Sequence, residues 1–272
     1  MLALAVPSIR AAATPYQLDS DSVPLDSPRA QGPLNAVCAG KLTHMAVGVV
    51  GEQEKRLTCT VCPPEVPNGT FWWPMSAIFG HFITPASDDV ILSTYGCESH
   101  AGGLGGSFLL AHTGGIWKRV SYTPGLMTDP CKKVRRSDRR DSLLCEGLDG
   151  HLGEGHTSYE MVFERGGKLE HNSFFYFQDT TQVCRDFATS QTAVSTELRS
   201  TGRGYDLFID VSSGRAELTD RQKRQCHQGK IPIVPTTKYR LLFRFDGVDF
   251  QPTPNTARAV KEIENLVDDS FF

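Results

Sequence analysis

The sequence lacks the long apolar run that a transmembrane helix needs, because no hydrophobic stretch approaches 18 residues. It also has little net charge: 28 lysines and arginines stand against 31 aspartates and glutamates, which gives a net charge of −3. This balance argues against a globally basic nucleic-acid-binding protein and against a protein with a polyacidic tail. We therefore expect no transmembrane segment and no nucleic-acid partner.

Familiar catalytic motifs are also missing. The sequence contains no G-x-S-x-G nucleophile motif, no H-E-x-x-H zinc motif and no G-x-G-x-x-G dinucleotide-binding motif. We accordingly assign no catalytic and no metal-binding residue, and we favour a protein without enzymatic activity while leaving the enzyme class open.

Glycine and proline are frequent, with 25 and 16 residues, which favours many turns and short strands over long helices. From residue 34 onward, short apolar runs alternate with turn residues, for example at 78–84, 90–94, 107–111 and 205–211. Only residues 255–269 have apolar residues at helical spacing, with Asn255 or Thr256 as the expected N-cap. The sequence predicts an all-β domain over residues 34–254, followed by a C-terminal helix and tail over residues 255–272.

Residues 1–33 contain five prolines and no hydrophobic periodicity, which predicts a disordered leader or linker. Apolar residues 2–6 are too few for the core of a signal peptide, although the small residues 11–13 are typical of a cleavage zone. The leader is therefore interpreted either as the remnant of a signal peptide or as an ordinary flexible tail.

Cysteine usage indicates the compartment. An even number of widely spaced cysteines predicts up to four disulfides and export to an oxidising compartment, although buried reduced thiols are the alternative. The eight cysteines allow 105 pairings, so we assign none. The candidates for disulfide bonding are Cys38, Cys59, Cys62, Cys97, Cys131, Cys145, Cys184 and Cys226. We expect a secreted or periplasmic protein.

Cys59 and Cys62 form a C-x-x-C motif that could serve redox exchange or half of a zinc site. Pro63 and Pro64 follow where a thioredoxin-like motif would begin a helix, and no second C-x-x-C completes a zinc site. We favour disulfides to distant partners and keep a metal- or redox-dependent module as an alternative.

Two stretches share a pattern of an acidic turn, a short apolar strand, a glycine-rich loop and a second strand. The first runs from Gly80 through Asp89 and Cys97 to Trp117, and the second from Cys131 through Asp141 and Cys145 to the Gly-Gly turn at 166–167. This pattern resembles the FG-GAP and VCBS-type repeats of β-propeller proteins, mainly over residues 75–175. The resemblance implies a propeller-like fold of four or five irregular blades; a β-sandwich with similar hairpins is the alternative.

The resemblance also implies a non-catalytic role in binding a protein or a glycan through the loops. The calcium loop of such repeats, D-x-D-x-D-G, is incomplete here, because Arg139 and Arg140 separate Asp138 from Asp141 and the earlier loop offers only Asp88 and Asp89. Calcium needs about six to eight oxygen ligands. We expect no cofactor, with calcium as the alternative.

The candidate ligand-binding residues fall into two groups. Trp72 and Trp73 could stack on a ligand or, if buried, form part of the core, where we also expect Trp117. A run of six basic residues at 132–140 could bind anions, although such runs are usually solvated loops. The full set of candidates is Trp72, Trp73, His100, Lys132, Lys133, Arg135 and Arg136.

A hydrolase with a site built from loops is the competing function. Glu98 and His100 could act as an acid–base pair with Ser99 as nucleophile, and Glu154 and His156 lie two residues apart in a glycine-rich stretch. This interpretation requires these side chains to converge in one pocket.

Overall fold

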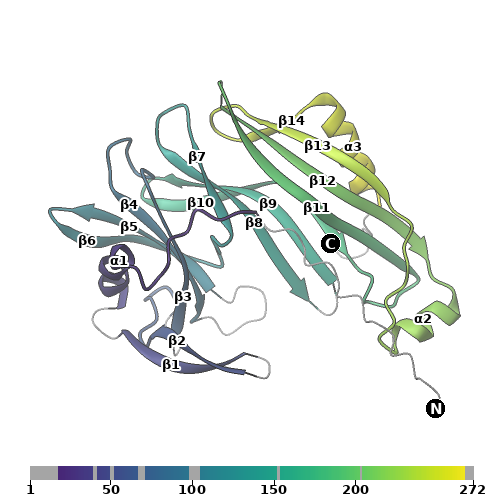
Figure 1. The fold of residues 1–272 in the computed structure, drawn as a ribbon, viewed down its shortest axis with the longest axis horizontal. Helices are drawn as coiled ribbons and strands as arrows, with labels where there is room; N and C mark the ends of the chain where they lie inside the picture. Colours follow the sequence, from purple (N-terminus) through teal and green to yellow (C-terminus); the bar gives the residue numbers. More distant parts are fainter. Residues whose placement is uncertain are drawn as a thin grey trace, which may run out of the picture.

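The computed structural model describes residues 18–38, 42–49, 52–66, 71–97, 105–151, 154–202 and 204–266. These residues form antiparallel sheets of six, four and four strands, with short helices at their margins (Figure 1). The prediction of an all-β protein is confirmed. None of the described helices is long and apolar enough to span a lipid bilayer.

The first sheet is a meander in which each strand pairs with the next one along the chain. Its strands are β1 (Leu42–Val49), β2 (Glu52–Cys59), β3 (Trp72–Gly80), β4 (Asp89–Gly96), β5 (Gly105–Thr113) and β6 (Ile116–Pro124). We expected a strand over residues 78–84, but β3 ends at Gly80. The chain turns there, because the amides of Phe82 and Ile83 donate hydrogen bonds to the Asp89 carboxylate. The predicted runs at 90–94 and 107–111 lie within β4 and β5.

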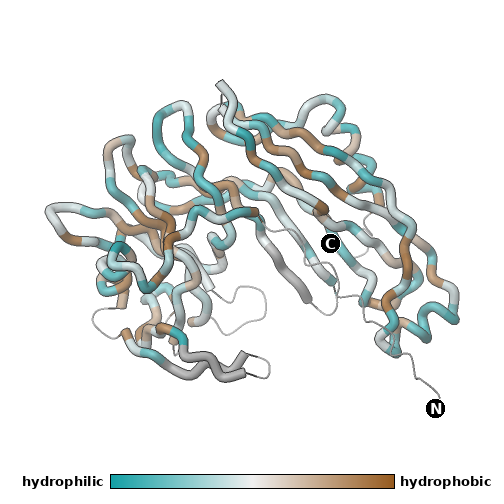
Figure 2. Tube along the Cα trace, viewed as in Figure 1, coloured by the Kyte–Doolittle hydropathy of each residue, from teal (hydrophilic) through white to brown (hydrophobic). Residues whose placement is uncertain are grey.

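Two further meanders complete the β structure. The second sheet contains β7 (Cys131–Arg135), β8 (Asp141–His151), β9 (Glu154–Arg165) and β10 (Lys168–Asp179). The third contains β11 (Phe187–Thr201), β12 (Gly204–Glu217), β13 (Thr237–Phe245) and β14 (Phe250–Pro252). The long strands curl into a half-barrel (Figure 1), and hydrophobic and hydrophilic residues alternate along them (Figure 2).

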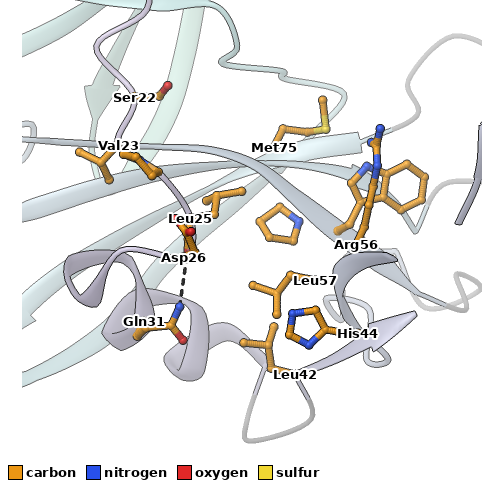
Figure 3. A pocket seen from close by; sticks show the side chains of 13 residues that line it. Ser22, Val23, Leu25, Asp26, Gln31, Leu42, His44, Arg56, Leu57 and Met75 are labelled. Atoms are coloured by element: carbon orange, nitrogen blue, oxygen red, sulfur yellow. Dashed lines mark hydrogen bonds between the residues drawn. The ribbon is translucent and has the colours of Figure 1, made fainter. Parts of the chain in front are cut away.

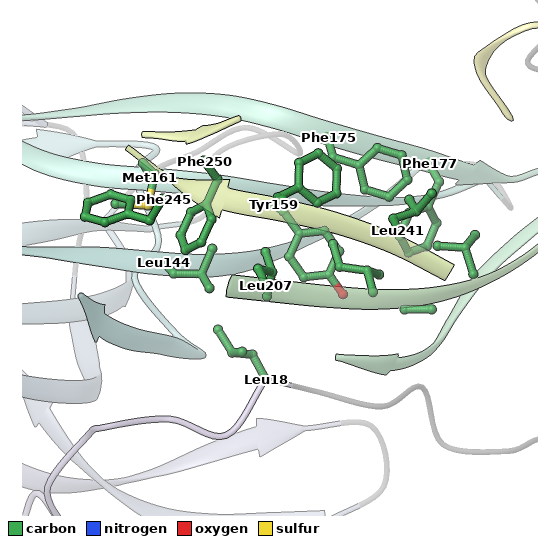
Figure 4. Close-up of a cluster of buried hydrophobic side chains, with 14 of the residues drawn as sticks. Leu18, Leu144, Tyr159, Met161, Phe175, Phe177, Leu207, Leu241, Phe245 and Phe250 are labelled. Atoms are coloured by element: carbon green, nitrogen blue, oxygen red, sulfur yellow. The ribbon is translucent and has the colours of Figure 1, made fainter. Parts of the chain in front are cut away.

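The second sheet is buried on both faces. Leu143 and Val162 pack toward the first sheet with Ile78, whereas Leu144 and Met161 belong to the core shared with the third sheet. Burial of both faces accounts for the unbroken apolar run at 143–145. Figure 4 shows the core between the second and third sheets, which includes Tyr159, Phe175, Phe177, Leu207, Leu241, Phe245 and Phe250.

The helices are α1 (Pro28–Cys38), α2 (Asp220–Cys226) and α3 (Pro254–Glu264). The predicted C-terminal helix is confirmed, but its N-cap is Thr253, whose hydroxyl accepts a hydrogen bond from the Thr256 amide. Proline at the first position of α3 suits a helix start, since no intrahelical bond needs its missing N–H. Thr256 is instead buried and accepts a hydrogen bond from the Leu242 amide.

The N-terminal segment differs from the expected disordered leader. Residues 18–27, which we call the N-terminal strap, cross the sheets, and α1 follows directly. The Leu18 amide donates to the Glu146 carboxylate at 2.7 Å, and the Asp21 amide donates to the Cys131 carbonyl at 2.9 Å. Backbone hydrogen bonds and the buried side chain of Leu18 order the strap despite its lack of periodicity. Residues 1–17 lie outside the described part of the chain.

Four disulfides use all eight cysteines, so the prediction of disulfide bonding is confirmed. The pairs are Cys38–Cys59, Cys62–Cys97, Cys131–Cys145 and Cys184–Cys226. Cys59 and Cys62 bond to different distant partners, so this structure contains no C-x-x-C dithiol. The arrangement of the sheets as propeller blades stays a prediction.

Candidate functional site

A groove of about 850 Å³ opens where the N-terminal strap, α1, β1, β2 and β3 meet (Figure 3). We call it the Trp73 groove. Its apolar lining consists of Val23, Leu25, Leu42, Leu57, Trp73 and Met75, together with two prolines. Its polar residues are Ser22, Asp26, Gln31, His44 and Arg56.

The groove exists because β3 is only partly paired along one edge. β2 pairs with β3 at one position, Cys59 opposite Trp72, and the strap meets the same strand through the bridge between Val23 and Ala77. Between these two points no described segment pairs with that edge, and Trp73, Pro74 and Met75 line the groove there. Proline has no backbone N–H to donate to a neighbouring strand, which favours such an interruption.

Two disulfides fix the surroundings of the groove. Cys38–Cys59 joins the end of α1 to the end of β2, and Cys62–Cys97 joins the following loop to the end of β4. Leu34 of α1 is fully buried against the first sheet. The walls of the groove are therefore covalently and hydrophobically anchored on more than one side.

Trp73 is the centre of an aromatic cluster. Its ring lies 4.7 Å from that of Tyr95, its cross-strand partner, and 6.1 Å from that of Phe71. The guanidinium of Arg56 lies 5.9 Å from the Trp73 ring, within the range of cation–π attraction. The indole Nε1 of Trp73 is buried and has no hydrogen-bond partner among the described residues. A buried donor without a partner is rare, and this one belongs to a residue that lines the groove.

The rim of the groove carries both signs of charge. Figure 3 shows Arg56 and His44 on the side of the β1–β2 hairpin and Asp26 on the side of the strap. The Gln31 side chain donates to the Leu25 carbonyl at 3.1 Å and so holds the strap against α1. The site thus combines an apolar floor with a few polar side chains at its edge, as ligand-binding sites commonly do.

Trp72 requires a correction. Neighbouring residues in a strand point to opposite faces, and Trp72 is only 1% exposed, with its Nε1 donating to the Val61 carbonyl at 2.9 Å. It packs against Phe108 in the core and is not available to a ligand. Trp117 is partly buried against the same core, as expected.

The basic run at 132–140 is strand β7 and its hairpin turn, not a solvated loop. Lys132 pairs with Asp19 at 2.9 Å, Lys133 donates to the Phe79 carbonyl at 2.8 Å, Arg135 pairs with Asp141 at 3.1 Å, and Arg136 pairs with Asp138 at 3.5 Å. These partners neutralise much of the charge, which weakens the case for an anion site there. The predicted role of the four residues in ligand binding stays a prediction.

The residues of the competing hydrolase hypothesis are only partly placed. Glu98, Ser99 and His100, which was also a candidate for ligand contact, lie outside the described residues. Glu154 and His156 lie on β9 with Oε2 and Nε2 3.6 Å apart, away from the residues that line the groove. Across the described part of the chain, no three His, Cys, Asp or Glu side chains gather as a metal site would require.

Most of the groove was not predicted from the sequence. Arg56, Leu57, His44 and the strap carry no motif, and they come together through contacts between distant segments. The C-x-x-C was the one sequence feature that pointed to this region. Disulfides from Cys59 and Cys62 to two distant cysteines bring other segments close to the part of the chain that leads to Trp72 and Trp73. Comparison of the chain with known protein families, curated proteins and solved structures found no match.

Proposed function

We propose that this protein is a secreted or periplasmic, non-catalytic binding protein that takes a segment of a partner protein in the Trp73 groove. The observation that carries the proposal is the groove itself, where an interrupted strand edge and a half-buried tryptophan line the same space.

The lining favours a protein segment over a glycan. Apolar side chains form most of the groove, and sugar hydroxyl groups placed against leucine, valine and methionine would lose hydrogen bonds to water. An apolar or aromatic side chain of a partner would instead gain free energy from burial there. The edge of β3 between Trp72 and Ala77 also leaves room for an extended segment, although Pro74 has no N–H to donate to it, so side-chain burial carries the proposed recognition.

Four disulfides support the proposed export, because disulfides persist in oxidising compartments and are rare in the cytosol. The resemblance to FG-GAP and VCBS-type repeats agrees with a binding role. The meanders β7–β10 and β11–β14 favour that resemblance, because a propeller blade is a four-stranded sheet, whereas the first sheet has six strands.

The test is to screen the full chain in parallel against a phage-displayed library of random peptides and against a glycan array. We expect peptides with an aromatic or aliphatic anchor residue to be enriched. The substitution Trp73→Ala should weaken their binding at least tenfold, because loss of a central aromatic contact commonly costs 2 kcal/mol or more.

The matched control is Ile116→Ala, an exposed apolar residue in the β5–β6 turn, which should leave affinity unchanged. Binding that is independent of Trp73 would refute the groove as the site. Trp73-dependent binding of glycans alone would replace the protein ligand with a glycan.

A further inference from the structure

The end of the molecule around α2 differs in charge from the rest of the chain. Residues 215–240 contain seven lysines and arginines but only two acidic residues, whereas the remaining residues contain 21 and 29. A protein with a net charge of −3 thus concentrates positive charge in one short segment, and such asymmetry produces a local attractive field for anions. The segment includes α2 and residues 230–236, which belong to no helix or strand and lead into β13.

Residues 230–236 present two isoleucines to solvent. Ile231 is 59% exposed and Ile233 is 89% exposed, whereas Pro232 and Val234 are partly buried. Exposure therefore alternates along these residues, and both isoleucines face solvent. Pro232 and Pro235 restrict the backbone and hold this presentation.

Basic side chains without an ion pair in the described part of the chain precede the two isoleucines in the sequence. Arg221 and Arg224 of α2 and Lys230 form no ion pair with any residue in the described ranges, whereas Lys223 is bonded to Asp186 and Asp220. The Lys230 amide donates to the Gln225 carbonyl at 3.0 Å, which holds the stretch against α2. Cys184–Cys226 in turn ties α2 to the loop that precedes β11. The charges therefore lie on a disulfide-anchored helix, and the isoleucines follow it directly in the chain.

We propose that this unit, the α2 patch of Arg221, Arg224, Lys230, Ile231 and Ile233, docks on the surface of an anionic lipid bilayer. Isoleucines that project from a basic surface can insert at the headgroup boundary while arginine and lysine pair with lipid phosphates. A soluble polyanion would use the charges alone and would leave the isoleucines in water. α2 and the Trp73 groove lie at opposite ends of the long axis, so a docked molecule keeps its groove accessible (Figure 1).

The test is sedimentation of the full chain with vesicles of phosphatidylcholine alone and of phosphatidylcholine with 30% phosphatidylglycerol, about 0.1 M salt being present to screen weak charge contacts. Binding is expected only to the anionic vesicles. The double substitution Ile231→Ser/Ile233→Ser should weaken binding at least tenfold. Arg221→Gln/Arg224→Gln should weaken it about 25-fold, because each basic residue near an anionic surface contributes about fivefold in affinity.

The matched controls are Ile116→Ser, an isoleucine of similar exposure, and Arg258→Gln/Lys261→Gln on the exposed side of α3; both should bind like the wild type. A separate Ile233→Trp variant gives a positive signal, since its fluorescence should shift to the blue with anionic vesicles. Failure of the wild type to bind anionic vesicles, or equal binding by the isoleucine variant, would overturn the proposal. Neither result affects the Trp73 groove, which the peptide screen tests independently.

Discussion

Glu146 is a buried carboxylic acid at the point where the N-terminal strap meets the core. It is 2% exposed, and one of its oxygens accepts the hydrogen bond from the Leu18 amide. Burial raises the pKa of Glu146 above its ordinary value of 4.5, although hydrogen bonds from Leu18 and Tyr159 act in the opposite direction. The folded protein therefore holds this proton more tightly than the unfolded chain does.

The raised pKa of Glu146 decides whether the free energy of unfolding rises or falls with pH. The native state binds more protons than the unfolded state between pH 4.5 and the raised value, so the contribution of Glu146 to the free energy of unfolding falls as pH rises through that window. Glu146→Gln keeps an acceptor for Leu18 and removes the buried charge. We expect the variant to have a larger free energy of unfolding than the wild type at pH 7 and an equal one near pH 3.5, as measured by urea denaturation.

The control for Glu146 is Glu262→Gln on α3, where the side chain is exposed and the substitution should change the free energy of unfolding by less than about 0.5 kcal/mol. An equal effect of Glu146→Gln at both pH values would show that the charge of Glu146 does not carry the difference.

For single residues, the sequence indicated which side chains could bind a ligand, but it did not indicate which of them point away from the core. It identified Trp72 and Trp73 as a pair of candidates, but alternation along a strand does not say which of two neighbours faces the core. That choice depends on the Cys59–Trp72 pairing and on the position of Phe108. The basic run likewise appeared as a patch, because the acids that neutralise it, such as Asp19, come from distant segments.

At the scale of elements, α3 shows how a short helix depends on its tertiary contacts. Its inward side chain, Ile263, is fully buried in the core between the second and third sheets. The Ile263 carbonyl accepts a hydrogen bond from the Gln191 side chain at 2.8 Å. An 11-residue helix is marginal by itself in water, so these contacts supply most of its stability.

Truncation of Ile263 should therefore be costly. We expect Ile263→Ala to lower the free energy of unfolding by about 2–5 kcal/mol, because it removes buried methyl groups and leaves a cavity. The exposed Val248→Ala should change it by less than about 0.5 kcal/mol. Denaturation in urea measures both, and similar values for the two variants would contradict the docking of α3.

Elements with a local signal were predicted from the sequence, and elements without one were not. The helical spacing at 255–269 gave α3, and the Gly-Gly turns gave the hairpins, since Gly114 and Gly115 adopt positive φ angles of 62° and 81°. The strap gave no signal, because its order comes from backbone hydrogen bonds to β3 and β7 and from a contact to Glu146, which lies 128 residues away.

At the scale of the whole molecule, cysteine count and turn chemistry were sufficient for the fold class and the disulfides, but not for connectivity. Long-range pairing decides which of the 105 arrangements forms, and it also decides where β3 is left with an unpaired edge. The Trp73 groove is a product of that pairing. Its walls depend on Cys38–Cys59 and Cys62–Cys97, which split the C-x-x-C between two partners.

We propose that this chain is exported and that its disulfides hold the Trp73 groove open, and the state of its thiols is the first property to measure. The measurement is the intact mass after alkylation, with and without reduction, followed by mapping of disulfide-linked peptides, on protein produced with an export signal. We expect no alkylation without a reductant, eight alkyl groups after reduction, and linked peptides that join Cys59 to Cys38 and Cys62 to Cys97. Alkylation of Cys59 and Cys62 without a reductant would contradict it.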